Sequence, residues 1–259
     1  MWEYSITMDS DKAKIAKYIF NNLKPSVDAV EGVITSYEEM GKINIVLACK
    51  KLEKSRLSYH ITEIISYVIS TFLKEDFLDK SLKFPQKDKL ELYTFKKALV
   101  SFDRETDRFL INKYLVLEEN LILESFFHFK LQPLKEKWQE LVKIANDNST
   151  YLLSDDSFLE LLKFLIDNIE IASDELNVVI QQEKIFLFDS NFHQIGDPKI
   201  NVDEFGLVNK ILELSPRKIN WVCDKNIPFI EKVFSKRLLY VSENDFAKKD
   251  IKNWGLQNS

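Results

Sequence analysis

Charged residues alternate more densely between positions 103 and 108 than elsewhere in the chain. The run is Asp103, Arg104, Glu105, Thr106, Asp107 and Arg108. Two carboxylates one helical turn apart, such as Asp103 and Asp107, can act as acid and base or hold a divalent cation, and the two arginines can clamp a phosphate. In the alternative interpretation, Asp103 is a helix N-cap and the other charges pair at spacings of three and four residues. We favour this structural interpretation.

The thiol of Cys223 is a second candidate for chemistry. It closes the strand-like run KINWVC and precedes a helix expected to begin near Asn226. Ligands gather at the carboxyl ends of parallel strands, and amide dipoles at a helix N-terminus lower the pKa of a thiol. Free cysteine is, however, usually buried, no histidine is adjacent in sequence, and Asp224 opposes a thiolate. Cys223 and Asp224 are therefore candidates for an enzyme site without an assigned role.

Basic residues gather near the C-terminal end of the chain. Between positions 217 and 237, six basic residues face two acidic ones; the six are Arg217, Lys218, Lys225, Lys232, Lys236 and Arg237. Such a patch can bind nucleic acid or another outside partner. Positions 131–170 carry eight acidic against four basic residues, so the two segments can also complement each other within the fold. We favour an internal or merely solvated role for the basic residues.

Glycine and histidine are too scattered for the common ligand motifs. The five glycines are isolated, whereas phosphate-binding loops cluster glycines so that backbone amides can approach the anion. This pattern excludes a P-loop and a dinucleotide-binding fingerprint. His60 with Glu63 could form half of a metal site, but an exposed helix edge explains the pair equally well. We expect no cofactor and no metal.

Three phenylalanines surround a histidine at positions 126–129, with Lys130 following. Aromatic rings beside basic residues can stack the bases of single-stranded nucleic acid. No run of basic residues surrounds this cluster, so we interpret Phe126, Phe127 and Phe129 as core residues.

The composition is that of a globular protein of 259 residues with a formal net charge of −5. This charge argues against general binding of DNA or RNA, which depends on many lysines and arginines. The two cysteines give no disulfide framework. The N-terminus lacks the pattern of a secretory signal, and no apolar run approaches the roughly 20 residues of a membrane span. We expect a cytoplasmic protein that is not inserted into a membrane.

The first 54 residues predict a small α/β cap. Trp2, Tyr4, Ile6 and Met8 alternate with polar residues, which is typical of a half-buried strand. A helix capped by Asp9 or Ser10 and ended by Pro25 should follow, with Ile15, Ile19 and Leu23 on its inner face. Runs at 27–37 and 42–49 predict a hairpin that turns at Gly41.

The rest of the chain predicts an α+β fold. A helical bundle over 55–171 should contain helices beginning near positions 55, 88, 105, 134 and 156. An α/β region over 172–245 should hold a second hairpin, a helix over 203–214 and a β-α-β unit. In that unit Asn226 should cap the helix, Pro228 should lie in its first turn, and the two strands should be parallel. A polar tail over 246–259 follows.

The second half of the chain resembles the YtxC family of sporulation proteins. The resemblance lies in LILESFFHFKLQPLKEKWQELVKIA (121–145), SFLELLKFLIDNIE (157–170), ELNVVIQQEKIFLFDSNFHQI (175–195) and the segment 204–241. Phe129, Lys130 and Leu131 match a phenylalanine-basic-leucine element of the family, with Lys where Arg is usual. The resemblance implies an endospore-forming bacterium, a cytoplasmic location and a link to sporulation, but no reaction.

Together, these observations predict a sporulation-associated protein with a non-catalytic role in protein interaction. Two alternatives remain: an enzyme with a site near Cys223 and Asp224, and a nucleic-acid binder that uses the basic segment 217–237. The identity of the protein partner and the oligomeric state stay open.

Overall fold

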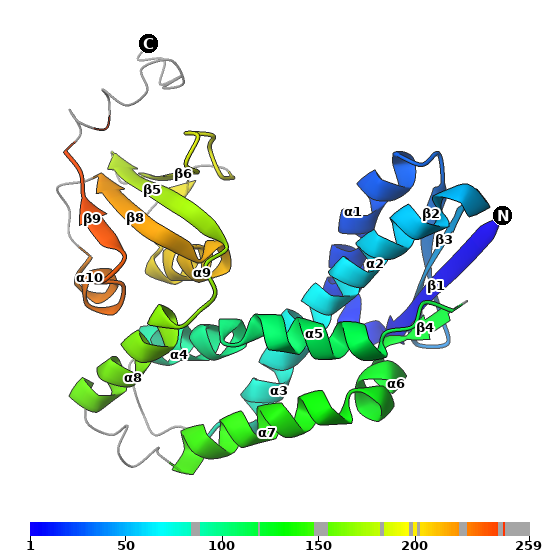
Figure 1. Ribbon diagram of the computed structural model, residues 1–259, viewed down its shortest axis with the longest axis horizontal. Coiled ribbons are helices and arrows are strands. Elements are labelled where there is room, and N and C mark those ends of the chain that lie inside the picture. Colours follow the sequence, from blue (N-terminus) through cyan, green and yellow to red (C-terminus); the bar gives the residue numbers. More distant parts are fainter. Residues whose placement is uncertain are drawn as a thin grey trace. The chain divides into compact units, whose positions relative to one another are not determined.

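The computed structural model describes residues 1–83, 89–118, 120–147, 155–181, 184–196, 199–200, 203–222, 227–242 and 246. Its mixture of sheets and helices confirms the predicted α+β class (Figure 1). The chain divides into a first unit, Met1–Leu82 with Arg104–Asp147, and a second unit, Lys83–Asp103 with Asn148–Ser259. The predicted helical region 55–171 therefore contributes to both units, and this division follows none of the boundaries predicted after positions 54, 171 and 245.

The first unit combines a four-stranded sheet with helices. In chain order its elements are β1 (Trp2–Asp9), η1 (Ser10–Lys12), α1 (Ala13–Asp28), β2 (Val33–Glu39), β3 (Lys42–Cys49), η2 (Lys51–Glu53), α2 (Lys54–Val68), η3 (Ile69–Leu73), α3 (Lys74–Ser81), α5 (Arg104–Tyr114), β4 (Asn120–Ile122), α6 (Leu123–Ser125), η4 (Phe126–Lys130) and α7 (Gln132–Asp147). The strand order is β2-β3-β1-β4.

The N-terminal strand has the predicted alternation. Tyr4, Ile6 and Met8 of β1 are buried, and β1 pairs with the antiparallel β3 from Trp2↔Cys49 to Asp9↔Lys42. On its other side β1 pairs with β4 in parallel. The sequence does not predict strand β4, because three residues (Asn120, Leu121 and Ile122) are too few to show a period-two pattern.

The first hairpin turns at the predicted glycine. β2 and β3 are joined by Met40 and Gly41, with φ angles of 50° and 72°. Positive φ at both central residues is typical of a type I′ turn, whose twist matches that of the flanking strands. Glycine adopts this conformation readily, whereas methionine is strained by it.

Two expectations for the first helix are wrong. Helix α1 continues through Pro25 to Asp28, and Val27 in its last turn is buried. Proline so near the end removes only one helical hydrogen bond, and burial of Val27 offsets that loss. The Asp9 side chain makes no capping hydrogen bond and instead pairs with Lys42. The predicted inner face is confirmed, since Ile15, Ile19 and Leu23 are buried.

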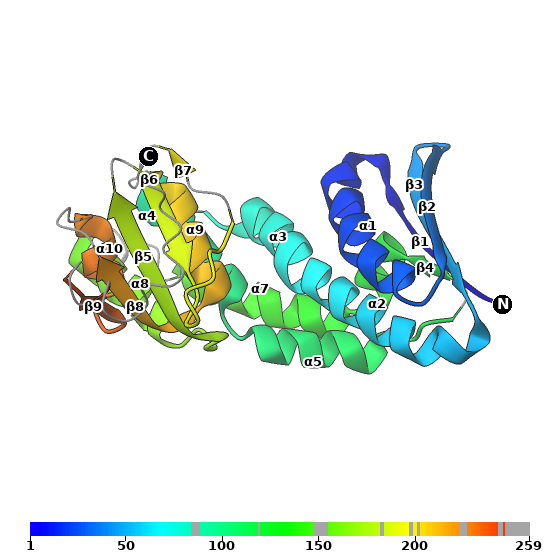
Figure 2. The same ribbon diagram turned by 90° about the horizontal axis from the view of Figure 1, so that it is seen from above.

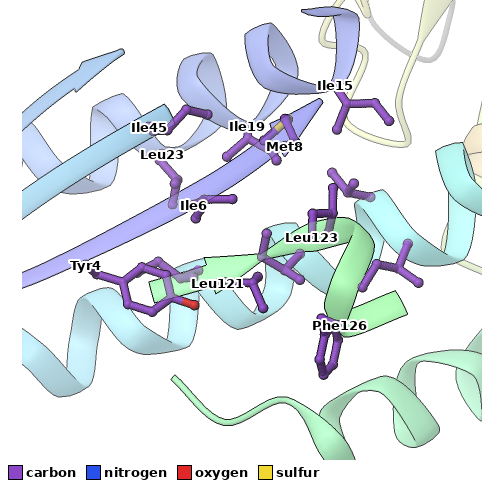
Figure 3. Packing of buried hydrophobic residues seen from close by; sticks show 14 of the residues in the cluster. Tyr4, Ile6, Met8, Ile15, Ile19, Leu23, Ile45, Leu121, Leu123 and Phe126 are labelled. Carbon is purple, nitrogen blue, oxygen red and sulfur yellow. The ribbon is translucent and has the colours of Figure 1, made fainter. Parts of the chain in front are cut away.

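The core of the first unit lies where the sheet, α1 and α2 meet. Helix α1 packs against β2, β3 and α2, and Figure 2 shows it beside the sheet. Ile6 of β1 and Leu121 of β4 enter the same cluster as Leu123 and Phe126, which follow β4 (Figure 3). The buried side chains of Leu121, Leu123 and Phe126 thus anchor the segment from β4 to Phe126 in the core.

The described residues of the second unit form a five-stranded sheet and four helices. Its elements are α4 (Lys89–Ser101), α8 (Asp155–Asp167), β5 (Ser173–Gln181), β6 (Lys184–Phe188), β7 (Lys199–Ile200), α9 (Glu204–Leu214), β8 (Pro216–Val222), α10 (Pro228–Val233) and β9 (Leu238–Tyr240), with strand order β7-β6-β5-β8-β9. Helix α4 packs against α8 and α9, and α10 packs against α8.

The C-terminal prediction holds for its main elements. β5 and β6 form an antiparallel hairpin, and β8 and β9 are parallel strands joined through α10, which has Pro228 in its first turn. The predicted cap Asn226 lies outside the described residues. Phe246, the first residue of the predicted polar tail, is buried beside Val179 and Val222.

Among the described residues, no helix has the length and apolar character needed to cross a lipid bilayer.

Candidate functional site

Asp107, from the charged run, is buried between two lysines of the first unit. Its Oδ2 lies 2.7 Å from Nζ of Lys74, and its Oδ1 lies 2.8 Å from Nζ of Lys137. The Asp107 and Lys74 side chains are 0% and 1% exposed. Because each carboxylate oxygen already accepts a hydrogen bond from an ammonium group, the arrangement joins α3, α5 and α7 as an internal ion cluster.

The surroundings of Lys74 destabilise the charged form of its side chain. Lys74 follows the π-helical segment η3, and its Nζ lies 5.9 Å from the centre of the Trp138 ring. Burial lowers the pKa of the Lys74 ammonium, as do the charges of Lys137 and Arg104, whereas Asp107 acts in the opposite direction. A buried cation of this kind persists in a fold only with an anion in contact.

Other members of the run occupy separate surroundings. Arg108 forms an ion pair with Glu63 of α2, the candidate metal ligand one turn after His60. The expected pairing within the run is therefore wrong for Asp107 and Arg108, whose partners come from other helices. Asp103 immediately precedes α5 and has a φ of 54°. The described residues contain no group of three or more side chains that could hold a metal ion.

Three residues of the basic segment have internal partners in the second unit. Lys218 pairs with Glu175 at 3.1 Å, and Lys236 pairs with Asp167 at 2.5 Å. The guanidinium of Arg237 donates to the carbonyl oxygens of Ile166 at 2.6 Å and Ile169 at 3.2 Å. Ile166 lies in the last turn of α8, where a helix leaves acceptors unsatisfied, and Ile169 follows two residues after its end. Arg237 therefore caps the C-terminal end of α8. Burial lowers the pKa of its guanidinium.

The remaining predicted site residues are less informative. Cys223, Asp224 and Lys225 lie outside the described residues. Arg217 and Lys232 are both exposed, Lys232 on α10. The other cysteine, Cys49, is buried on β3, and loss of solvent raises the pKa of its thiol.

The second unit contains a pair of buried asparagines that the sequence does not indicate. Asn177 of β5 and Asn220 of β8 are paired in register, and Nδ2 of Asn220 donates to Oδ1 of Asn177 at 2.8 Å. Oδ1 of Asn220 is buried, and none of the residues that the structure describes donates a hydrogen bond to it. The period-two pattern of these strands does not distinguish a buried asparagine from an exposed one.

The aromatic cluster at 126–130 is divided between core and surface. Phe126 is buried and Phe127 packs against Trp138, as predicted for core residues. Phe129 is 78% exposed, so the core interpretation is wrong for this residue. The reason is local: Phe126 to Lys130 form the π-helical turn η4, which buries its first residue and turns Phe129 outward.

A groove of about 550 Å³ lies beside β4 in the first unit. We call it the β4 groove; its lining includes Lys113, Val116, Glu118, the three residues of β4, Phe129 and Lys130. Val116, Ile122 and Phe129 are 66%, 44% and 78% exposed. Three large apolar side chains gathered around one hollow form the kind of surface that binds another molecule.

A second hollow of about 620 Å³ lies on the same sheet, lined by Tyr37, Val46 and the polar residues Glu3 and Ser5. Tyr37 is 49% exposed. Its lining also includes Met1, Trp2 and Tyr4. Tyr37 provides a matched control for Phe129, because it is an exposed aromatic residue on the same sheet.

Comparisons of the chain with protein-family models, with curated proteins and with solved structures give no match.

Proposed function

We propose that this chain has a non-catalytic role in protein interaction during spore formation, in the cytoplasm of an endospore-forming bacterium. The β4 groove is the observation that carries the interaction role. Its exposed residues Val116, Ile122 and Phe129 come from three segments that the core holds in place.

The way in which Phe129 is held supports this role. Phe126 and Leu131, on either side of it, are 7% and 0% exposed. The backbone of η4 is therefore anchored while the ring of Phe129 remains in solvent. An aromatic side chain presented on a fixed backbone loses little conformational freedom on binding, and such residues are enriched among the energetically dominant residues of interfaces.

The link to sporulation is supported by the resemblance to the YtxC family. The resembling segment 121–145 includes most of β4, η4 and α7. The phenylalanine-basic-leucine element of that resemblance contributes two of its residues, Phe129 and Lys130, to the groove.

Photo-crosslinking in sporulating cells tests the proposal. A photoreactive phenylalanine analogue at position 129 should capture a distinct protein, whereas the same analogue at position 37 should not. The Phe129→Ser variant should lose co-purification of that protein and lower the yield of spores, and Tyr37→Ser should do neither. Equal crosslinking at both positions, or normal sporulation in Phe129→Ser cells, would contradict the proposal.

A further inference from the structure

The β4 groove follows the edge of a strand. All three residues of β4 line it, although successive side chains of a strand point to opposite faces. A hollow that all three residues reach therefore lies beside the strand. Within the described part of the chain, β4 pairs only with β1. Its other edge thus presents backbone donors and acceptors that another strand can use.

The apolar part of the groove comes from segments before, within and after β4 in the chain. Val116 precedes β4 in the chain, Ile122 ends it, and Phe129 follows it in η4. An extended peptide beside β4 would place alternate side chains toward the same face, where these residues can contact them. An apolar residue at every second position fits this arrangement.

The charged lining favours an acidic partner. Lys113 and Lys130 line the groove, and neither forms an ion pair among the residues that the structure describes. Among the described residues that line the groove, Glu118 is the one that is acidic. The two ammonium groups can pair with carboxylates of a bound peptide, whereas Glu118 disfavours a continuous polyanion such as a nucleic acid.

We propose, on the basis of the interaction role above, that the β4 groove binds an extended peptide with alternating apolar and acidic residues, which adds to the sheet as a strand beside β4. Backbone hydrogen bonds to β4 hold the peptide, its apolar side chains contact Val116, Ile122 and Phe129, and its carboxylates meet Lys113 and Lys130. Because β4 has only three residues, the partner strand is short.

Fluorescence anisotropy with the full chain tests this inference. The probe is a labelled, capped octapeptide of alternating valine and glutamate. Two further versions are N-methylated at every second residue, one at the valines and the other at the glutamates. Each version keeps every side chain but lacks the N–H groups that point to one side of the peptide strand. One of the two should bind at least tenfold more weakly than the parent, and a peptide with lysine in place of glutamate should also lose at least tenfold. Equal binding by the parent and both N-methylated versions would overturn strand addition.

Matched protein variants locate the binding. Phe129→Ser and the double variant Lys113→Glu with Lys130→Glu should each weaken the parent peptide at least tenfold, while Tyr37→Ser should change its affinity less than twofold. Circular dichroism should show that all variants remain folded, because these side chains are exposed. Failure of the peptide to bind a chain that still crosslinks through position 129 in cells overturns strand addition and leaves the interaction role standing. Tighter binding of a single-stranded oligonucleotide that depends on Phe129 overturns the inference in favour of nucleic acid.

Discussion

Nζ of Lys74 lies 2.7 Å from Oδ2 of Asp107, and both side chains are almost completely buried. Lys137 contacts the other carboxylate oxygen of Asp107 and is partly exposed. The three residues come from three helices, so one buried carboxylate fixes how α3, α5 and α7 pack. Because the cluster is desolvated, its members depend strongly on one another.

Removing the carboxylate should be costly. Asp107→Asn leaves the buried ammonium of Lys74 without its anion and should lower the free energy of unfolding by about 3–5 kcal/mol. Adding Lys74→Met to this variant removes the buried cation and should restore much of the stability. Urea denaturation of both variants measures the difference. A double variant that is no more stable than Asp107→Asn would show that the charge of Lys74 is not the cause.

Stability should depend on pH through Lys74. Burial lowers the pKa of Lys74 in the folded chain below its ordinary value of 10.5. At pH values between the lowered pKa of the folded chain and the ordinary pKa of the unfolded chain, the unfolded chain binds more protons than the folded one. The free energy of unfolding should therefore rise with pH in that window. The Lys74→Met variant should lack this contribution. Urea titrations from neutral to alkaline pH test it, and parallel profiles for the two chains would exclude Lys74 as the titrating group.

The two faces of η4 should respond differently to truncation. Phe126 is 7% exposed and Phe129 is 78% exposed. Phe126→Ala should therefore cost about 3–5 kcal/mol of stability by leaving a cavity, whereas Phe129→Ala should change stability by less than about 0.5 kcal/mol. Thermal unfolding followed by circular dichroism compares the two. Similar losses would mean that Phe129 packs into the protein in solution.

Arg237 should be needed for the end of α8. Arg237→Lys retains a positive charge but removes the fork that reaches the carbonyls of Ile166 and Ile169, and it should cost about 1–3 kcal/mol. Lys236→Ala, at an exposed ion pair, should cost less than about 1 kcal/mol. Hydrogen exchange should show faster opening of α8 in the first variant alone. Unchanged protection of α8 in Arg237→Lys would contradict this role.

The first hairpin offers a stabilising substitution. Met40 is 94% exposed and has a φ of 50°, a conformation that asparagine tolerates better than methionine. Met40→Asn should raise the free energy of unfolding by about 0.5–1 kcal/mol. Met40→Val should lower it, because a β-branched residue adopts positive φ least readily. The midpoints of urea denaturation should rank asparagine above methionine and methionine above valine.

The sequence predicts elements where one face is regularly apolar. The alternation in β1, the stripe of α1 and the hairpin at Gly41 are local patterns, and the structure has them at these positions. Contacts between distant residues leave no such pattern. The charged neighbours of Asp107 mark it as a candidate in the sequence, but its partners Lys74 and Lys137 lie 33 and 30 positions away.

The β4 groove shows the same limit. Strand β4 has three residues, which are too few to reveal a period, and it pairs with β1, which lies far away in the sequence. Phe129 has the sequence character of its neighbour Phe126, and only the π-helical turn separates their environments. One sequence signal could have marked the groove. It is the apolar run that Glu124 and Ser125 interrupt, because this run is too long for one buried strand.

The discontinuity of the first unit affects how the protein is synthesised. When the ribosome has translated residues 1–103, it has made β1, β2, β3 and Lys74, but α5, β4 and α7 are still to come. Until α5 emerges, Lys74 has no Asp107 to meet and its ammonium must stay hydrated, so the helix that carries it cannot settle into its final packing. A pause in translation before position 104 would therefore prolong the life of an incomplete sheet with an open β1 edge, the stage at which a chaperone would be most useful to this chain.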